Sequence, residues 1–200
     1  MIKQGTAFWC FLLLALVFSC VVQSFGNDSL LSFDRSAILS GEYWRLITGG
    51  WLHHNAPHML MNLLALSILW CLLIPPLTDG FCLLLLVLLV SLVDLGILIL
   101  VPKTQHYWGL SGALHGLFAI ATCLQFIDKK RLAALWLIGL ILKLVWDTAH
   151  LDDTTAQLIG TRVHVESHIL GSMAGLAIGL ALLLWQRQAQ RNRVNLTTKD

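Results

Sequence analysis

Long runs of apolar residues dominate this chain and limit what it can fold into. Of its 200 residues, 57% are hydrophobic and only 12% are charged, whereas about 25% of the residues of a soluble domain are charged. A chain with so few charges must place most of its surface in lipid. We therefore predict a membrane protein that crosses the bilayer several times, and a single domain at this length.

Six apolar segments are long enough, or nearly so, to cross a membrane as helices. They are residues 6–25, 58–75, 81–101, 110–127, 131–149 and 165–185. A bilayer core about 30 Å thick takes about 20 residues of helix. We therefore predict an all-α membrane protein with six transmembrane helices in a bundle over residues 1–185. A polar, disordered cytoplasmic tail is expected over residues 186–200.

The basic residues predict the orientation of these helices. If the N-terminus is cytoplasmic, eight of the 13 Lys and Arg residues lie in inner regions and four in outer loops, and Lys143 lies within a helix. The inner ones are Lys3, Lys129, Lys130, Arg131, Arg187, Arg191, Arg193 and Lys199, and the outer ones are Arg35, Arg45, Lys103 and Arg162. Because cytoplasmic loops carry an excess of Lys and Arg, we predict that both termini are cytoplasmic. Six helices, an even number, fit two termini on the same side.

This orientation brings polar residues from three helices to one depth. Ser111 begins the fourth segment, and His168 begins the sixth. His58 and Asn62 begin the second. All three segments run inward from the outer side, so these side chains are expected together, a short way below the outer surface.

Small residues at helical spacing follow both the serine and the histidine. The stripes are Gly109, Gly112, Gly116 and Ala119 in one segment, and His168, Gly171, Gly175 and Gly179 in the other. Small residues at this spacing let two helix backbones come close. Such contact would bring the imidazole of His168 to the hydroxyl of Ser111, although packing alone also explains glycine stripes.

His58 and Asn62 lie one turn apart on one helix face. Both side chains can donate hydrogen bonds, and polar groups at this depth are costly unless they are used. One use is to stabilise the oxyanion that develops during acyl transfer, with the backbone N–H of Ser111 as a third donor. The alternative is that both residues tie their helix to a neighbour or to the loop over 26–57.

A serine hydroxyl needs a base to become a nucleophile. His168 is the candidate across the helix interface, and His115 is a rival because it is four residues from Ser111. No carboxylate is clearly placed to orient His168, since Glu166 is only two residues away and points to a different face. We therefore predict a Ser–His dyad and not a full triad.

Four motifs together resemble the rhomboid family of intramembrane serine proteases. They are Trp44–Arg45 in the first loop, His53, His58 and Asn62 as H-x4-H-x3-N, "GLSG" at 109–112, and His168, Gly171 and Gly175 as H-x2-G-x3-G. They occur in the right order, and the six-helix core covers nearly the whole chain. The resemblance implies that Ser111 is the nucleophile and His168 the base. It also implies that His58, Asn62 and the N–H of Ser111 form an oxyanion hole.

The chain departs from the family at two positions and resembles one branch of it. Many rhomboids have Tyr four residues after the serine, packed against the catalytic histidine, where this chain has His115; Ser167 replaces a common Ala. The short chain and "GLSGALHGL" resemble the rhombosortases. That branch implies a bacterial inner membrane location. It also implies membrane-anchored protein substrates with a C-terminal Gly-Gly motif, a membrane helix and a basic end. We expect the lipid bilayer as the surroundings and no nucleic-acid partner.

The remaining polar residues suggest structural roles. Asp94 and Lys143 are charges inside predicted helices and are expected to pair with each other, or Lys143 with Asp147 at i+4. No histidine or carboxylate set has a recognised ligand spacing, so we predict no metal and no cofactor. The five cysteines lie in apolar runs without a C-x-x-C motif and are expected to be buried, inert thiols.

Two other functions fit parts of this pattern. A catalytically inactive rhomboid-like binding protein is one, but the chain keeps both Ser111 and His168. A small transporter or metal-binding membrane protein that uses the histidines and intramembrane charges is the other. Its function would survive Ser111→Ala.

Overall fold

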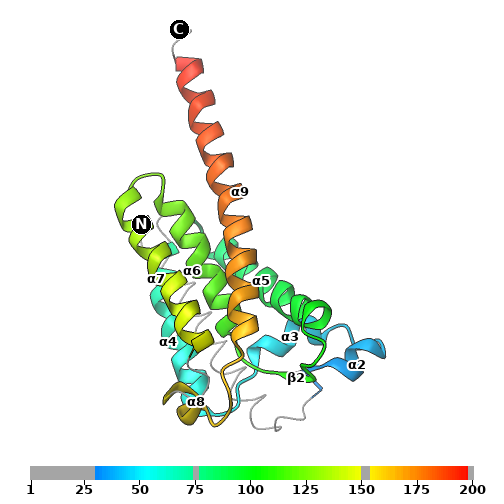
Figure 1. Cartoon of the computed structure of the whole chain (residues 1–200). Helices are drawn as coiled ribbons and strands as arrows, with labels where there is room; N and C mark the ends of the chain where they lie inside the picture. The colour runs from blue at the N-terminus through cyan, green and yellow to red at the C-terminus, as the bar shows by residue number, and fades with distance from the viewer. Residues whose placement is uncertain (1–29, 74–76, 150–153, 198–200) are drawn as a thin grey trace.

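The computed structural model describes residues 30–73, 77–149 and 154–197, with side chains as far as Asn192. The helix predicted over 6–25 lies outside the described residues. The described elements are β1 (Phe33–Asp34), α2 (Arg35–Leu39), α3 (Arg45–Thr48), η1 (Gly49–Trp51), α4 (Ala56–Leu73), α5 (Asp79–Leu100), β2 (His106–Tyr107), α6 (Ser111–Gln125), α7 (Lys130–Ala149), α8 (Thr154–Ile159) and α9 (Val165–Thr197). Figure 1 shows the long helices as a bundle, with the short helices α2, α3 and α8 gathered at one end.

Four helices among the described residues are long and apolar enough to cross a membrane. They are α4, α5, α7 and α9, the last counted as far as Asn192. Together they make the chain a multi-pass membrane protein. Helix α6, with 15 residues, is shorter than these four. The count of six spans and the cytoplasmic position of both termini therefore stay predictions.

Helix α6 is the centre of the bundle. Eleven of its 15 residues are buried, and Leu117 and Ile120 pack into a core with Leu86 of α5 and Trp70 of α4. An apolar helix surrounded by protein needs less length than one that faces lipid along its whole span. The central position of α6 explains why the helix that begins with Ser111 can be shorter than the helices around it.

The two predicted glycine stripes pack against each other. A methyl group built on Gly171 or Gly175 would overlap the carbonyl oxygens of Gly112 and Gly116, respectively. A methyl group on Gly112 would in turn lie 2.8 Å from the carbonyl oxygen of Ser167. Only glycine permits backbones this close, so the expected contact between α6 and α9 is confirmed.

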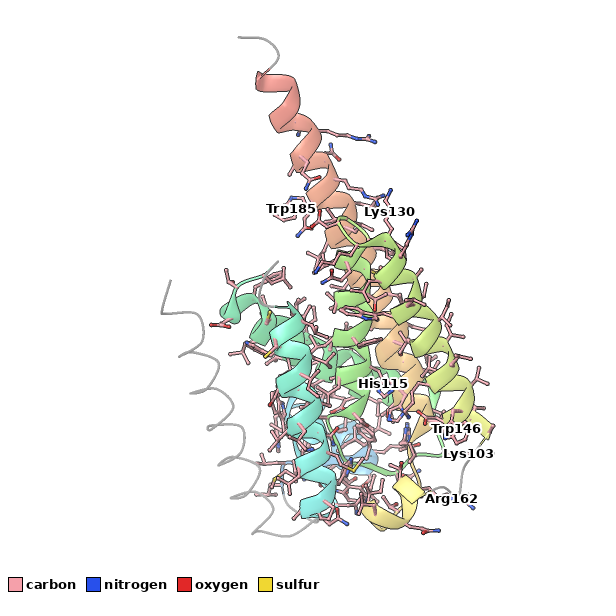
Figure 2. The ribbon with its side chains drawn as sticks, turned by 90° about the vertical axis from the view of Figure 1, so that its left-hand side faces the viewer. Lys103, His115, Lys130, Trp146, Arg162 and Trp185 are labelled. Carbon is pink, nitrogen blue, oxygen red and sulfur yellow. The ribbon has the colours of Figure 1, made fainter. Side chains whose placement is uncertain are left out.

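Helix α7 lies at the edge of the bundle. Its buried residues are Ala133, Leu140 and Asp147, while large apolar side chains along its length are exposed. These include Leu135, Ile138, Leu142 and Val145. In a membrane protein such a face contacts lipid. Figure 2 shows Trp146 near the end that carries Lys103 and Arg162, away from Lys130.

Arg35 fastens the loops at one end of the bundle to helix α5. Its guanidinium donates hydrogen bonds of 2.7–2.9 Å to four carbonyl oxygens. These belong to Ile97, Leu98, Val101 and Thr104. The last carbonyls of a helix lack partners within it, so Arg35 satisfies the end of α5. Antiparallel pairing of Phe33 with Tyr107 then holds the segment that leads to α6.

Two expectations about the fold are wrong. The tail predicted to be disordered from Gln186 continues α9 to Thr197, because no proline or glycine follows Gly179 and Gln, Arg and Ala favour helix. Cys82 and Cys123 are buried as expected, but Cys71 is exposed. An apolar run does not distinguish a side chain that faces protein from one that faces lipid. Cys10 and Cys20 lie outside the described residues.

Candidate active site

A glycine turn places Ser111 at the start of α6. Gly109 has a φ of +115°, which favours glycine. A methyl group there would also lie 2.7 Å from Cε1 of His58. The Tyr107 hydroxyl donates a hydrogen bond of 2.7 Å to the carbonyl oxygen of Gly109. Both the conformation and the space around Gly109 therefore require glycine at this position, just before Leu110 and Ser111.

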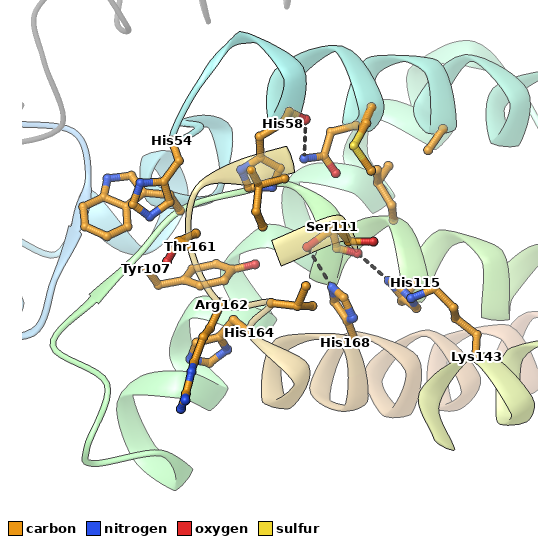
Figure 3. A pocket seen from close by; sticks show the side chains of 18 of the residues that line it. His54, His58, Tyr107, Ser111, His115, Lys143, Thr161, Arg162, His164 and His168 are labelled. Carbon is orange, nitrogen blue, oxygen red and sulfur yellow. Dashed lines mark hydrogen bonds between the residues drawn. The ribbon is translucent and has the colours of Figure 1, made fainter. Parts of the chain in front are cut away.

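Ser111 and His168 face each other across the α6–α9 interface. Oγ of Ser111 lies 3.0 Å from Nε2 of His168, a hydrogen bond drawn in Figure 3. The His168 residue is only 5% exposed. Since the carboxylate of Asp147 lies 2.8 Å from Nδ1 and only accepts hydrogen bonds, Nδ1 carries the proton. Nε2 is then free to accept from the serine hydroxyl.

The cap of α9 fixes where His168 lies. His164 precedes α9, and its Nδ1 accepts a hydrogen bond of 3.2 Å from the backbone N–H of Ser167. Its Nε2 bonds Oγ1 of Thr104 at 2.9 Å, which makes Nε2 the donor. Burial lowers the pKa of His164, and the neutral form suits both bonds. The sequence alone does not single out His164, because a capping histidine has no distinctive pattern.

His115 stacks on His168. The two rings lie nearly parallel, 16° apart with centroids separated by 4.0 Å. Nδ1 of His115 donates a hydrogen bond of 2.8 Å to the backbone carbonyl of Ser111, while the serine hydroxyl bonds His168. His115 therefore packs beside the pair, and the geometry favours His168 over His115 as the base.

His58 and Asn62 line the same cavity as Ser111. Asn55 caps α4 by accepting a hydrogen bond of 2.9 Å from the N–H of His58, and its amide donates to Leu158 of α8. Nδ2 of Asn62 donates to the carbonyl of His58 at 3.1 Å. Nδ1 of His58 is buried without a hydrogen-bond partner among the described residues. The four residues predicted to share one depth thus surround one cavity.

The cavity has a volume of about 340 Å³ and is lined in part by the loop that precedes α9. Figure 3 shows Ser111 and His168 on one wall, His58 on another, and Arg162 and Thr161 on the loop. Tyr107 also lines it, and burial raises the pKa of this phenol. A substrate segment in this cavity would therefore meet the serine, the histidine and the donors of α4 together.

Asp147 was missed as a site residue. Its Oδ1 forms an ion pair with Nζ of Lys143, and its Oδ2 bonds His168. The expectation that no carboxylate lies against His168 is therefore wrong. Of the two partners expected for Lys143, the structure has Asp147. Asp94 instead lies fully buried on α5 against Gly49.

A comparison with known families decides the class of this chain. The Rhomboid domain matches residues 40–185, which include every site residue described above. The chain belongs to the rhomboid family. Rhomboids are in general intramembrane serine proteases that act on membrane proteins within the bilayer. No curated protein matches the chain closely enough to be reported as a relative.

The first-loop motif of this rhomboid supports the loop and lies away from the cavity. Arg45 is buried, donates to the carbonyl of Ser32 at 2.7 Å and pairs with Glu42. The Trp44 indole donates to the carbonyl of Leu30 at 3.0 Å.

His53 packs edge-on against His58, with centroids 5.1 Å apart, and burial lowers the pKa of His53 to about 3. These contacts indicate structural roles for Trp44, Arg45 and His53.

Three side chains of this rhomboid are close enough to suggest a metal site. Ligand atoms of His115, Asp147 and His168 lie within 4.8 Å of one another. However, an imidazole binds a metal in its ring plane at about 2.0–2.1 Å. Because the two rings stack nearly parallel, a metal bound in the plane of one would lie outside the plane of the other. The absence of a metal or other cofactor stays a prediction, and the cluster suits proton transfer better.

Proposed function

We propose that this rhomboid is an active serine endopeptidase in which Ser111 is the nucleophile and His168 the general base. The observation that carries the proposal is the 3.0 Å hydrogen bond between Oγ of Ser111 and Nε2 of His168. A buried base within hydrogen-bond distance of a serine is the arrangement that nucleophilic catalysis needs. The chain's retention of both residues argues against an inactive binding protein.

The reaction follows from this geometry. Oγ of Ser111 attacks the carbonyl carbon of the scissile bond while Nε2 of His168 takes its proton. The protonated imidazole then gives this proton to the leaving amine, the C–N bond breaks, and an acyl-serine remains. Water loses a proton to His168 and attacks the ester, which releases the second product and restores the serine.

His58 and Asn62 are proposed to stabilise the oxyanion, together with the N–H of Ser111. A buried ring nitrogen of His58 without a hydrogen-bond partner among the described residues supports this role, because such a group is costly unless a ligand uses it. The amide of Asn62 bonds the His58 carbonyl and would turn toward the oxyanion. Donors that meet the developing charge accelerate acyl transfer.

The substrate is proposed to be a membrane-anchored protein cleaved near the outer, periplasmic face of a bacterial inner membrane. "GLSGALHGL" and the short chain support the rhombosortase branch and therefore a C-terminal tail with a Gly-Gly motif. The exposed apolar face of α7 and the loop before α9, which lines the cavity, are the proposed places of substrate entry.

Cleavage of a reporter tests the proposal. A membrane-anchored reporter would carry a Gly-Gly motif, a membrane helix and a basic end. We expect wild type to cleave it, Ser111→Ala and His168→Ala to be inactive, and the matched control Ser91→Ala on α5 to be active. Among the described residues, the Ser91 hydroxyl bonds only its own helix, at the carbonyl of Val87. Full cleavage by Ser111→Ala would contradict the protease, and would favour the transporter or metal-binding alternatives.

A second reporter distinguishes a rhombosortase from other proteases of the rhomboid family. Replacing its Gly-Gly motif by Leu-Leu should abolish cleavage if the chain is a rhombosortase. Equal cleavage of both reporters would leave a serine protease of the rhomboid family and contradict the Gly-Gly specificity.

A further inference from the structure

Asp147 is a buried carboxylate with a partner for each oxygen. Its side chain is 3% exposed and lies near the end of α7. Oδ2 accepts from Nδ1 of His168 at 2.8 Å, and Oδ1 pairs with the ammonium of Lys143. A buried carboxylate is costly unless it is paired and hydrogen-bonded, and these two contacts meet that need.

The contact with His168 controls which ring nitrogen carries the proton. A carboxylate accepts but does not donate, so it holds the proton on Nδ1 and leaves the lone pair of Nε2 facing Ser111. It also fixes the ring against rotation. When the imidazole takes the serine proton, the carboxylate stabilises the positive charge that results.

We infer that Asp147 is the positioning residue of His168, so that Ser111, His168 and Asp147 form a triad assembled from three helices. This inference rests on the proposed function. It differs from the dyad that the sequence and the family resemblance imply. The Lys143 ammonium, whose side chain is 52% exposed and lines the cavity, holds the carboxylate in place.

The competing explanation is that Asp147 is only a structural anchor, which stabilises the end of α7 through its ion pair with Lys143 on the same helix. The two accounts predict different results for the two partners of the ion pair. If Asp147 is only an anchor, Lys143→Met and Asp147→Asn should have similar effects. If it positions His168, Lys143→Met should do less harm, because the carboxylate remains against Nδ1.

Kinetics of the full chain in detergent or vesicles test the inference. In Asp147→Asn, we expect kcat to fall by about 10²–10⁴-fold, with KM little changed, because an amide can hold the wrong tautomer. Asp147→Glu should recover part of the loss, and Lys143→Met should lose less than Asp147→Asn. Asp128→Asn, the same change at an exposed position before α7, is the matched control and should behave like wild type.

Fluorophosphonate labelling separates this inference from the proposed function. If wild type is labelled and Ser111→Ala is not, a wild-type labelling rate in Asp147→Asn overturns the positioning role alone. Lack of labelling in wild type overturns both. The double variant Lys143→Met/Asp147→Asn leaves no unpaired ammonium. We expect this double variant to keep the thermal midpoint of the wild type, which would show that it is folded, and to have a kcat as low as that of Asp147→Asn. A wild-type kcat in the folded double variant would refute the inference.

Discussion

The α6–α9 interface and the edge helix α7 contribute to one site in opposite ways. At the interface, glycines bring two backbones into direct contact and fix Ser111 against His168. Helix α7 exposes most of its apolar face, yet it provides Asp147. The comparison suggests that rigid backbone packing holds the proposed nucleophile and base, while the position of the proposed orienting carboxylate depends on how a loosely packed helix docks.

The largest expected effect comes from filling the rigid interface. In Gly171→Ala the new methyl group would overlap the carbonyl oxygen of Gly112, so α6 and α9 must separate. We expect the free energy of unfolding to fall by about 3 kcal/mol and reporter cleavage to be lost. Thermal denaturation in detergent measures the first effect.

The matched change on α7 is Gly139→Ala, where no atom of the described residues, apart from its chain neighbours and its own helix backbone, lies within 4 Å of the added carbon. Alanine favours helix over glycine by about 1 kcal/mol, so stability should be unchanged or raised. Equal destabilisation by Gly139→Ala and Gly171→Ala would contradict the contrast between the two regions.

Removing a hydrogen-bond donor from the cavity wall opposite the α6–α9 interface is expected to lower activity less than Gly171→Ala does. We expect Asn62→Ala and His58→Ala each to lower kcat by about 10²-fold, because one oxyanion donor is lost. Stability should change less than in Gly171→Ala. Steady-state kinetics on the reporter measure this, and a rise in KM with unchanged kcat would instead assign these residues to substrate binding.

The stack on the base has the smallest expected effect on catalysis. His115→Ala removes the ring against His168 but leaves the Ser111 bond to His168 intact. We expect a loss of about tenfold or less in kcat, consistent with about 1 kcal/mol for one ring contact. Inactivation as complete as that of His168→Ala would make His115 the base. His115→Tyr, the residue common in the family, should retain activity.

The sequence predicted those parts of the site that depend on helical spacing. Gly171 and Gly175 follow His168 at intervals that place them on one face, so their contact with α6 could be foreseen. Asp147 could not be assigned, because its spacing from Lys143 does not show which face of α7 turns toward α9. His164 was missed for a related reason: its bond to Thr104 joins two loops whose proximity appears only in the fold.

The length of α9 and the exposure of Cys71 show another limit. The exposure of Cys71 depends on what lies next to an apolar run, which composition does not report, whereas the helix-favouring residues after Gly179 did indicate a longer α9 and only their polarity was considered. The helical spans at α4, α5, α7 and α9 were predictable because length and hydropathy alone decide them.

The most direct test of the central claim is to label the protein with a fluorophosphonate and locate the adduct by peptide mass spectrometry. The account predicts an adduct on Ser111 in wild type and in Ser91→Ala, and none in His168→Ala. An adduct on another serine, or labelling of His168→Ala at the wild-type rate, would contradict activation of Ser111 by His168.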